Sequence, residues 1–371
     1  MALTHISHQN ASVGMRVQDY WGRTGTIRWI GKIEKKSQSP TNQTGWHYGI
    51  EYDEESKNPL RSNGTWNDKQ YFTCPPRNGM LGVERDFYPE VNGKYVKLLR
   101  EKFGDQVATW HDFELVKFCI ARNYDMTKVI EMLKKHLKWR EEFKPSCDEY
   151  FPPSMAEDYS CGYTGTADYD ENLIFCEKPM NNKSCPAPVF VEKYTLPVIC
   201  RWHIAGIEMG LQYLRESNYH YKRMCYIVDL QNLTTFSRAM VTFAQKLSSI
   251  EQDNYPEMAG RVIMVNCPTF FRVCWKLFQL FINERTNQKI RFVPPGKGLE
   301  VLSQMMAVED IPDFCGGPSR KWIETNGGRL GSSDPTKVYK IGSCNVSDPG
   351  SLQVKRLENS PNMKDEDRRS I

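Results

Sequence analysis

Four short apolar segments in the second half of the chain constrain its fold most. They read LIFCE from Leu173, CYIVDL from Cys225, RVIMVN from Arg261 and KIRFV from Lys289, and stretches with helical spacing separate them. The segments lack the apolar and polar alternation of a half-exposed strand, so both of their faces must be covered. The pattern predicts an α/β region with a mainly parallel sheet between helices.

The rest of the chain divides into regions of different composition. Before about Glu90, short apolar and aromatic runs are interrupted by Gly, Pro and Asn, which indicates a small all-β domain. Amphipathic helical spacing begins near Asp112, and the chain beyond Glu324 is poor in apolar residues. We expect a β domain over residues 12–92, a linker over 93–111, an α/β domain over 112–322 and a disordered tail over 323–371. Residues 112–160 would form a helical leader, and 161–322 the sheet and its helices.

Charge and cysteine content limit the class of protein. The 371 residues include 49 basic and 45 acidic side chains, and this net charge of +4 does not predict a nucleic-acid partner. The 12 cysteines contain no CxxC pair and no zinc-like spacing. The chain shows neither a signal-peptide pattern nor an apolar run long enough to span a bilayer. We therefore expect a cytoplasmic protein with reduced thiols and no metal.

One helical segment is apolar around most of its circumference. Between Pro268 and Asn283, the polar side chains after Thr269 form one narrow stripe. A single sheet face cannot cover the remaining apolar surface, so a lipid tail or a membrane surface is expected to cover part of it. The alternative is a fully buried core helix. The large apolar side chains of this segment include Phe270, Phe271, Trp275, Phe278 and Phe281.

The N-terminal motifs GMRVQDYWGRTGTIRWIG, GWHYGIEYDE and YFTC resemble those of the CAP-Gly family. This resemblance implies a small β barrel or sheet that binds the acidic and aromatic C-terminal tails of tubulin or of end-binding proteins. The family's GKNDG loop is altered, and it aligns either with Ser56–Leu60 or with Leu60–Gly64. The alternative is a CAP-Gly fold that makes another contact, for example with the neighbouring domain. The expected groove residues are Trp46, Lys57, Asn58, Arg61, Asn63, Tyr71 and Phe72.

The segment from Asp112 to Trp322 resembles the CRAL-TRIO lipid-binding family. The resemblance covers FCIARNYDMTKVIEMLKKHLKWREEF as the helical leader, CYIVDL as the central strand, NYPEMAGRVIMVNCP as a helix-strand junction and IPDFCGG as the closing motif. It implies an α/β domain that holds one lipid in an internal pocket, and it makes the apolar helical segment a mobile gate. We expect a lipid-binding and transfer protein, with bound lipid and no cofactor.

Four residues match the head-group contacts of the family's phosphatidylinositol-transfer branch. YPEM supplies Glu257, TNQK supplies Thr286 and Lys289, and the leader supplies Arg122. A carboxylate accepts hydrogen bonds from inositol hydroxyls, while an ammonium and a hydroxyl meet the phosphodiester. The resemblance therefore favours phosphatidylinositol.

The central strand departs from that branch. Met224 and Tyr226 occupy the places of a Ser-x-Thr pair that binds phosphocholine, with Val228 following on the same face. Two bulky side chains narrow a pocket and remove small polar partners, so phosphatidylcholine is disfavoured. The alternative is that both side chains only pack.

Motifs of hydrolases, P-loop proteins, metalloproteases and phosphatases are missing from the sequence, which favours a protein that is not an enzyme. Two other functions stay open: a lipid-regulated scaffold without net transfer, and a carrier of a sterol, tocopherol or retinoid. In each case we expect peripheral contact with membranes, and contact with the cytoskeleton through the first domain.

Overall fold

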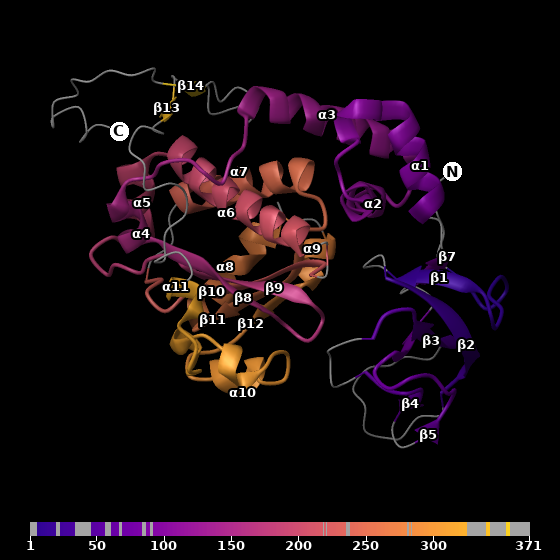
Figure 1. Ribbon diagram of the computed structural model, residues 1–371. Coiled ribbons are helices and arrows are strands. Elements are labelled where there is room, and N and C mark those ends of the chain that lie inside the picture. Colours follow the sequence, from indigo (N-terminus) through magenta and orange to yellow (C-terminus); the bar gives the residue numbers. More distant parts are fainter. Residues whose placement is uncertain are drawn as a thin grey trace. The chain divides into compact units, whose positions relative to one another are not determined.

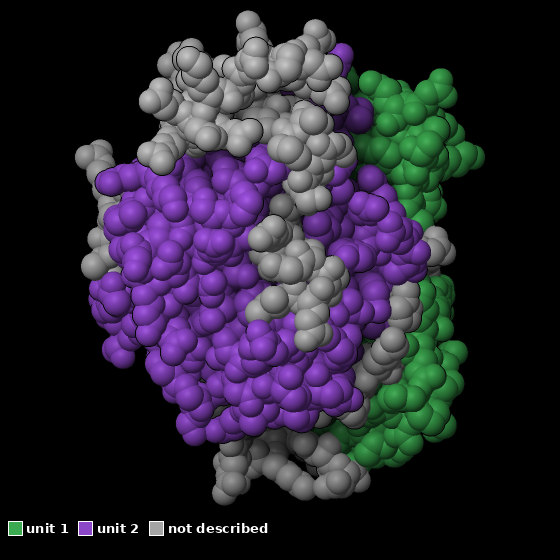
Figure 2. All heavy atoms as spheres, turned by 60° about the vertical axis from the view of Figure 1, so that its left-hand side comes forward, with its two compact units in different colours: residues 1–134 green, residues 135–371 purple. Residues whose placement is uncertain are grey.

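The computed structural model forms two compact units, residues 1–134 and 135–371, coloured separately in Figure 2. The structure describes residues 6–19, 23–33, 46–55, 61–66, 69–83, 87–89, 92–217, 219, 221–234, 238–279, 282, 284–324, 339–341 and 354–356. The expected groove residues Lys57 and Asn58 and the gate residue Phe281 lie outside this range. Most of the tail that we expect to be disordered, residues 323–371, also lies outside the described range. Its described parts include two paired strands, β13 (Tyr339–Ile341) and β14 (Val354–Arg356).

Unit 1 is built on an antiparallel sheet of five strands in the order β6-β3-β2-β1-β7. Its core holds Ile27, Tyr48 and Ile50, each fully buried. The strands are β1 (Arg16–Asp19), β2 (Thr24–Lys32), β3 (Trp46–Tyr52), β6 (Gly79–Val83) and β7 (Phe87–Pro89), and a separate hairpin joins β4 (Thr65–Trp66) to β5 (Lys69–Gln70). The expected β domain is confirmed.

Helices follow the sheet sooner than we expected. Residues 93–111, expected to be a linker, contain most of α1 (Asn92–Phe103) and the short helix η2 (Gly104–Val107). The physical reason is an apolar stripe, because Val96, Leu99 and Phe103 recur at helical spacing and are buried. The leader helices α2 (Asp112–Ala121) and α3 (Met126–Phe143) come next.

Unit 2 contains the predicted α/β sheet, in the strand order β12-β11-β10-β9-β8. Its strands are β8 (Ser160–Ala167), β9 (Asn172–Lys178), β10 (Arg223–Asp229), β11 (Ala259–Val265) and β12 (Ile290–Phe292). Strands β9 to β12 are parallel, and β8 pairs antiparallel with β9. The mainly parallel sheet predicted from the apolar runs is confirmed.

Helices cover both faces of this sheet, with α6 and α7 on one side and α10 on the other (Figure 1). On the α10 side, Cys225 and Ile227 of β10 pack with Leu302 and Met306 in a fully buried cluster. The helices of the unit are α4 (Pro153–Asp158), α5 (Ala187–Tyr194), α6 (Leu196–Glu216), α7 (Arg238–Asn254), α8 (Thr269–Gln279), α9 (Glu284–Gln288), α10 (Gly298–Leu302), η3 (Val308–Asp310), η4 (Asp313–Cys315) and α11 (Lys321–Glu324).

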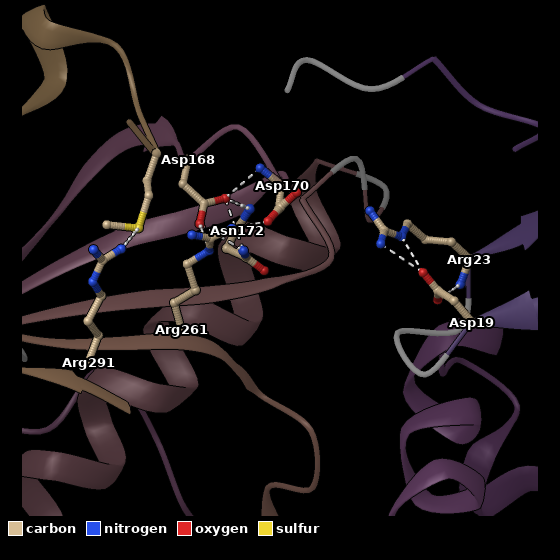
Figure 3. A network of polar contacts seen from close by, with 8 residues as sticks. Asp19, Arg23, Asp168, Asp170, Asn172, Arg261 and Arg291 are labelled. Atoms are coloured by element: carbon tan, nitrogen blue, oxygen red, sulfur yellow. Dashed lines mark hydrogen bonds and ion pairs between the residues drawn. The ribbon is translucent and has the colours of Figure 1, made fainter. Parts of the chain in front are cut away.

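A buried polar network ties the β8–β9 turn to β11 (Figure 3). Asp168 accepts hydrogen bonds from the backbone and side-chain nitrogens of Asn172, at 2.9 and 3.0 Å. Arg261 lies with Nε 3.1 Å from Asp168 and also pairs with Asp170. Because Asp168 is almost completely buried, its charge depends on these partners.

Candidate functional site

One face of the unit 2 sheet is apolar but incompletely covered. The side chains of Cys225 and Ile227 on the α10 side have 0% exposure, as expected for inner strands of a parallel sheet. On the opposite face, Met224 near the start of β10 is fully buried, whereas the residues further along β10 and those of β11 and β12 are half-buried. The half-buried residues are Tyr226, Val228, Val262, Met264, Ile290 and Phe292. This partly covered apolar face is the clearest place for an apolar ligand.

The helix α8 packs on this face through one side only. Phe271 and Trp275, four residues apart, are buried, and their rings lie 6.3 and 5.1 Å from that of Phe292. Phe270 is 37% exposed and Val273 is 70% exposed. The side chain of Phe278 is outside the described part of the chain. The expected excess of apolar surface is therefore present on α8, and part of it is uncovered.

Met224 and Tyr226 fill the sheet face near α6. The hydroxyl of Tyr163 donates to the carbonyl of Gly206 at 2.9 Å and lies 3.3 Å from the sulfur of Met224. Helix α6 approaches so closely that a Cβ at Gly210 would lie 2.0 Å from the Met224 methyl group. Both bulky residues therefore pack in this structure, where small hydroxyl side chains would leave space.

A small cavity lies between α6, α7 and strands β8 and β9. Its volume of about 10 Å³ has room for about one water molecule. Its lining includes a carboxyl group, on Glu177, and an imidazole, on His203. The lining consists of Tyr159, Cys161, Phe175, Glu177, Ile199, Trp202, His203 and Phe243. A lipid cannot enter this space unless the covering helices move.

The ionisable residues of the cavity are held by specific partners. The hydroxyl of Tyr159 donates to Glu177 Oε2 at 3.0 Å, and burial raises the pKa of Glu177. His203 Nε2 lies 2.5 Å from Glu251 Oε1; burial lowers the pKa of His203, but Glu251 outweighs it and the net direction is upward. Our sequence reasoning missed both groups. The available signal was a glutamate at the end of the apolar run LIFCE.

Two of the expected head-group residues contact each other. Lys289 Nζ donates to Glu257 Oε2 and to the carbonyl of Ala259, both at 2.9 Å, and the two side chains are only 7% and 6% exposed. Thr286 is half-buried one helical turn earlier, and its carbonyl accepts the Lys289 N–H at 3.0 Å. Three residues named from two separate motifs therefore lie on neighbouring elements of unit 2. Arg122 belongs to unit 1, where it caps the C-terminus of α2.

The NYPEM motif anchors helices. Arg140 of α3 pairs with both carboxylate oxygens of Glu208 on α6, at 2.7 and 3.1 Å. Tyr255 donates to the same carboxylate at 2.6 Å. Trp139 packs edge-on against the Tyr255 ring at 5.7 Å. These contacts fix Tyr255 against α3 and α6, and Tyr255 lies two residues before Glu257.

In unit 1 the structure separates the aromatic residues expected in one groove. Trp46 stacks on His8 at 5.1 Å and lies beside the apolar core. Phe72 approaches Gly49, which alternates onto the other face of β3. Tyr71 packs edge-on against Trp29 at 4.9 Å. Tyr71 and Phe72 therefore share a surface that Trp46 does not.

The altered loop contributes a basic side chain, Arg61, and a polar side chain, Asn63. Arg61 lies over the Tyr52 ring at 4.8 Å, and its buried Nη1 has no hydrogen-bond partner among the described residues. Asn63 accepts from Thr65 at 2.8 Å. Gly64 has a φ of +100°, and a Cβ there would lie 1.9 Å from the Phe72 carbonyl. Glycine is needed at this position, as in the Leu60–Gly64 alignment.

Family models match two segments of the chain. The CAP-Gly domain matches residues 13–85, and the CRAL/TRIO domain matches residues 157–317. This chain has a CAP-Gly domain followed by a CRAL/TRIO domain. The half-buried sheet face, α8 and the Glu257–Lys289 pair all lie within the CRAL/TRIO segment. Among the described residues, no group of His, Cys, Asp and Glu could hold a metal ion, and no helix is long and apolar enough to cross a bilayer.

Curated relatives match about two thirds of the chain. Patellin-6 of Arabidopsis thaliana is 30% identical over 255 residues, which are 67% of this chain and 59% of that protein. Protein real-time of Drosophila melanogaster is 26% identical over 63% of this chain and 36% of that protein. The crystal structure of Sfh5 aligns with a TM-score of 0.49 and 17% identity, over 57% of this chain and 82% of that one. The chain therefore spans between about a third and three fifths of the two curated relatives.

Proposed function

We propose that the CRAL/TRIO domain binds one phospholipid and transfers it between membranes, with its acyl chains against the half-buried face of β10, β11 and β12. The incomplete coverage of that apolar face carries the proposal, because β10 and β11 are inner parallel strands, which are otherwise buried on both sides. Burial of acyl chains contributes roughly 0.8 kcal/mol for each methylene group. A pocket that buries both chains therefore offsets the cost of withdrawing them from the apolar interior of a bilayer.

Uptake requires α8 to move, because Phe271 and Trp275 pack on the sheet face that the acyl chains would occupy. Phe270 and Val273 are exposed on α8 beside the basic residues Arg272 and Lys276. An apolar surface with cationic neighbours suits the interface of an anionic membrane. We therefore assign α8 as the gate helix, which docks on the membrane and closes over the lipid. The protein would act in the cytoplasm and at membrane surfaces.

Phosphatidylinositol is the proposed ligand. The Glu257–Lys289 pair offers a carboxylate for inositol hydroxyls and an ammonium for phosphate, and Thr286 adds a hydroxyl. Ligand binding would replace the contact between the two charged groups. Met224 and Tyr226 pack where a choline site would need small polar groups, and this favours phosphatidylinositol over phosphatidylcholine.

The CAP-Gly domain is proposed to tether the carrier to acidic C-terminal tails with a final aromatic residue, as on tubulin. Tyr71 is a partly exposed aromatic side chain packed against Trp29, and Lys69 lies over the Tyr71 ring at 5.3 Å. Arg61 and Asn63 lie on the loop that aligns with the family's carboxylate-binding loop. A peptide ending in Glu-Glu-Tyr tests this half, with the same peptide amidated at its C-terminus as the control.

Native mass spectrometry of the full chain from cells, followed by transfer between vesicles, tests the lipid half. We expect a phosphatidylinositol adduct and its net movement from donor to acceptor vesicles. A sterol, tocopherol or retinoid adduct would replace the phospholipid assignment. A phosphatidylinositol complex that never exchanges would identify a lipid-regulated scaffold in place of a carrier.

A further inference from the structure

The short helix α9 is held on one side by the gate helix. Asn287 Oδ1 accepts a hydrogen bond from Trp275 Nε1 at 3.3 Å and another from Gln279 Nε2 at 3.2 Å. Trp275 and Gln279 are four residues apart on α8, so one amide oxygen receives donors from two successive turns. An amide oxygen has two lone pairs and can serve both. Asn287 therefore latches α9 to α8.

The residue two positions beyond Asn287 anchors α9 on its other side. Lys289 Nζ is fixed to Glu257 and to the Ala259 carbonyl, and its own carbonyl accepts the Val262 N–H of β11 at 3.1 Å. The Lys289 N–H closes α9 by bonding to the carbonyl of Thr286. The latch and the Glu257–Lys289 anchor are thus two residues apart on one short element.

The latch can resist movement of α8 only while α9 stays in place. Trp275 is 6% exposed, so its N–H loses an acceptor in a dry environment if α8 swings away alone. If α9 is free to follow α8, both hydrogen bonds travel with the helix and resist nothing. The Glu257–Lys289 pair therefore decides whether Asn287 holds the gate.

We propose that Asn287 is a positioning residue that couples closure of the gate helix to the state of the Glu257–Lys289 pair. A head group with a phosphate and a polyol would bind Glu257 and Lys289 and so change the contacts that hold α9. The hydrogen bonds of Asn287 to Trp275 and Gln279 would then shift α8 together with α9. This inference rests on the proposed function for its ligand. The coupling within the empty protein does not depend on that ligand.

Hydrogen-deuterium exchange of the full chain without lipid tests the coupling. Three variants are compared with the wild type: Asn287→Ala, the charge-neutral pair Glu257→Gln with Lys289→Met, and their combination. Asn287→Ala and the neutral pair are each expected to raise exchange within residues 269–279 about fivefold, the effect of roughly one lost hydrogen bond. The combination is expected to add little, because both changes release the same latch. Gln288→Ala, on the same helix but bonded to Glu284, is the matched control and should change nothing.

Two results would overturn the coupling. One is a combined variant whose increase in exchange rate is the product of the two single increases, because independent contacts would give that result. The other is unchanged exchange in Asn287→Ala. Trp275→Phe adds a check, because it keeps the ring in its cluster and removes only the N–H; it should reproduce part of the Asn287→Ala effect.

Loading with phosphatidylinositol vesicles then tests the ligand part. We expect the lipid to slow exchange of α8 in the wild type, and to slow it much less in Asn287→Ala. If the lipid slows exchange of α8 equally in both proteins, Asn287 does not couple head-group binding to α8. If the chain loads no phosphatidylinositol while the empty-protein result holds, the proposed ligand is wrong and the latch stands.

Discussion

Gln18 of β1 donates a hydrogen bond from its side-chain amide to the hydroxyl of Tyr124, in the turn between α2 and α3, and both side chains are buried. The same hydroxyl donates to Asn92 at 2.8 Å. Asn123 and Tyr124 both adopt positive φ, at 51° and 58°. Asparagine tolerates this conformation at the end of a helix, whereas a tyrosine needs outside support. The sheet of unit 1 therefore supports the turn between the leader helices α2 and α3.

Replacement of Tyr124 by Phe is expected to destabilise unit 1 by about 1 to 3 kcal/mol. The change leaves the ring in place but removes the hydroxyl that bonds to the Gln18 amide and to Asn92, and the loss of two such hydrogen bonds costs about that much. Tyr95→Phe is the matched control: its ring lies 5.5 Å from that of Tyr124, and no hydrogen bond of its hydroxyl is described. Urea unfolding of the full chain measures both. Equal midpoints for the two variants would contradict the support of the turn by Gln18.

The linear pattern predicted the sheet of unit 2 well but placed the boundary between the units poorly. Continuous apolar runs such as that at Cys225 are a local signal, and they required covered strands. The Gln18–Tyr124 contact joins residues 106 positions apart, and no periodicity reveals such a pairing. The helix α1 had a local signal in Val96, Leu99 and Phe103, which we had assigned to a linker.

The candidate site was predictable only in part, and for similar reasons. Glu257 and Lys289 came from a family resemblance, whereas their direct ion pair is a tertiary contact across 32 residues. Strand alternation places Trp46 on the opposite face of β3 from Phe72, whereas the family resemblance alone put both residues in one groove. The cavity residue His203 gave no signal, because a lone histidine in an amphipathic helix is common.

Removal of one member of the Glu257–Lys289 pair is expected to cost more stability than removal of both charges. Lys289→Ala leaves a carboxylate that is 6% exposed without its cation, and breaking such a pair costs about 3 kcal/mol. Glu257→Gln combined with Lys289→Met leaves no buried charge and should cost less. Thermal unfolding of the three proteins checks the order. A single variant as stable as the wild type would mean that the pair is solvated.

The exposed apolar residues of α8 predict a selective loss of membrane binding. Val273 is 70% exposed, so Val273→Asp should leave stability within about 0.5 kcal/mol of the wild type. The new charge would have to enter the bilayer interface, and we expect binding to phosphatidylinositol-containing vesicles to weaken by roughly fivefold. Val308→Asp, at a residue 50% exposed outside α8, is the control. Co-sedimentation that falls equally in both variants would show general repulsion and not docking through α8.

Asp168 predicts a specific pH dependence of stability. Burial raises its pKa to about 6, although Arg261 and the hydrogen bonds from Asn172 act in the opposite direction. Between about pH 4 and pH 6 the folded protein therefore binds a proton that the unfolded chain has lost. The contribution of Asp168 to stability is fully present below about pH 4 and is lost as the pH rises through 6.

The test compares the free energy of unfolding of the wild type with that of Asp168→Asn from pH 3.5 to 8. The difference between the two proteins should change by up to about 3 kcal/mol between pH 4 and 6 and stay level above, since one pKa unit corresponds to about 1.4 kcal/mol. The informative quantity is the slope of this difference against pH, because loss of the Arg261 contact changes the free energy of unfolding by a similar amount at every pH. Glu141→Gln, at an exposed position of α3, is the control and should show a flat difference. A difference that instead grows in favour of the wild type as the pH rises would mean that Arg261 outweighs burial and lowers the pKa of Asp168.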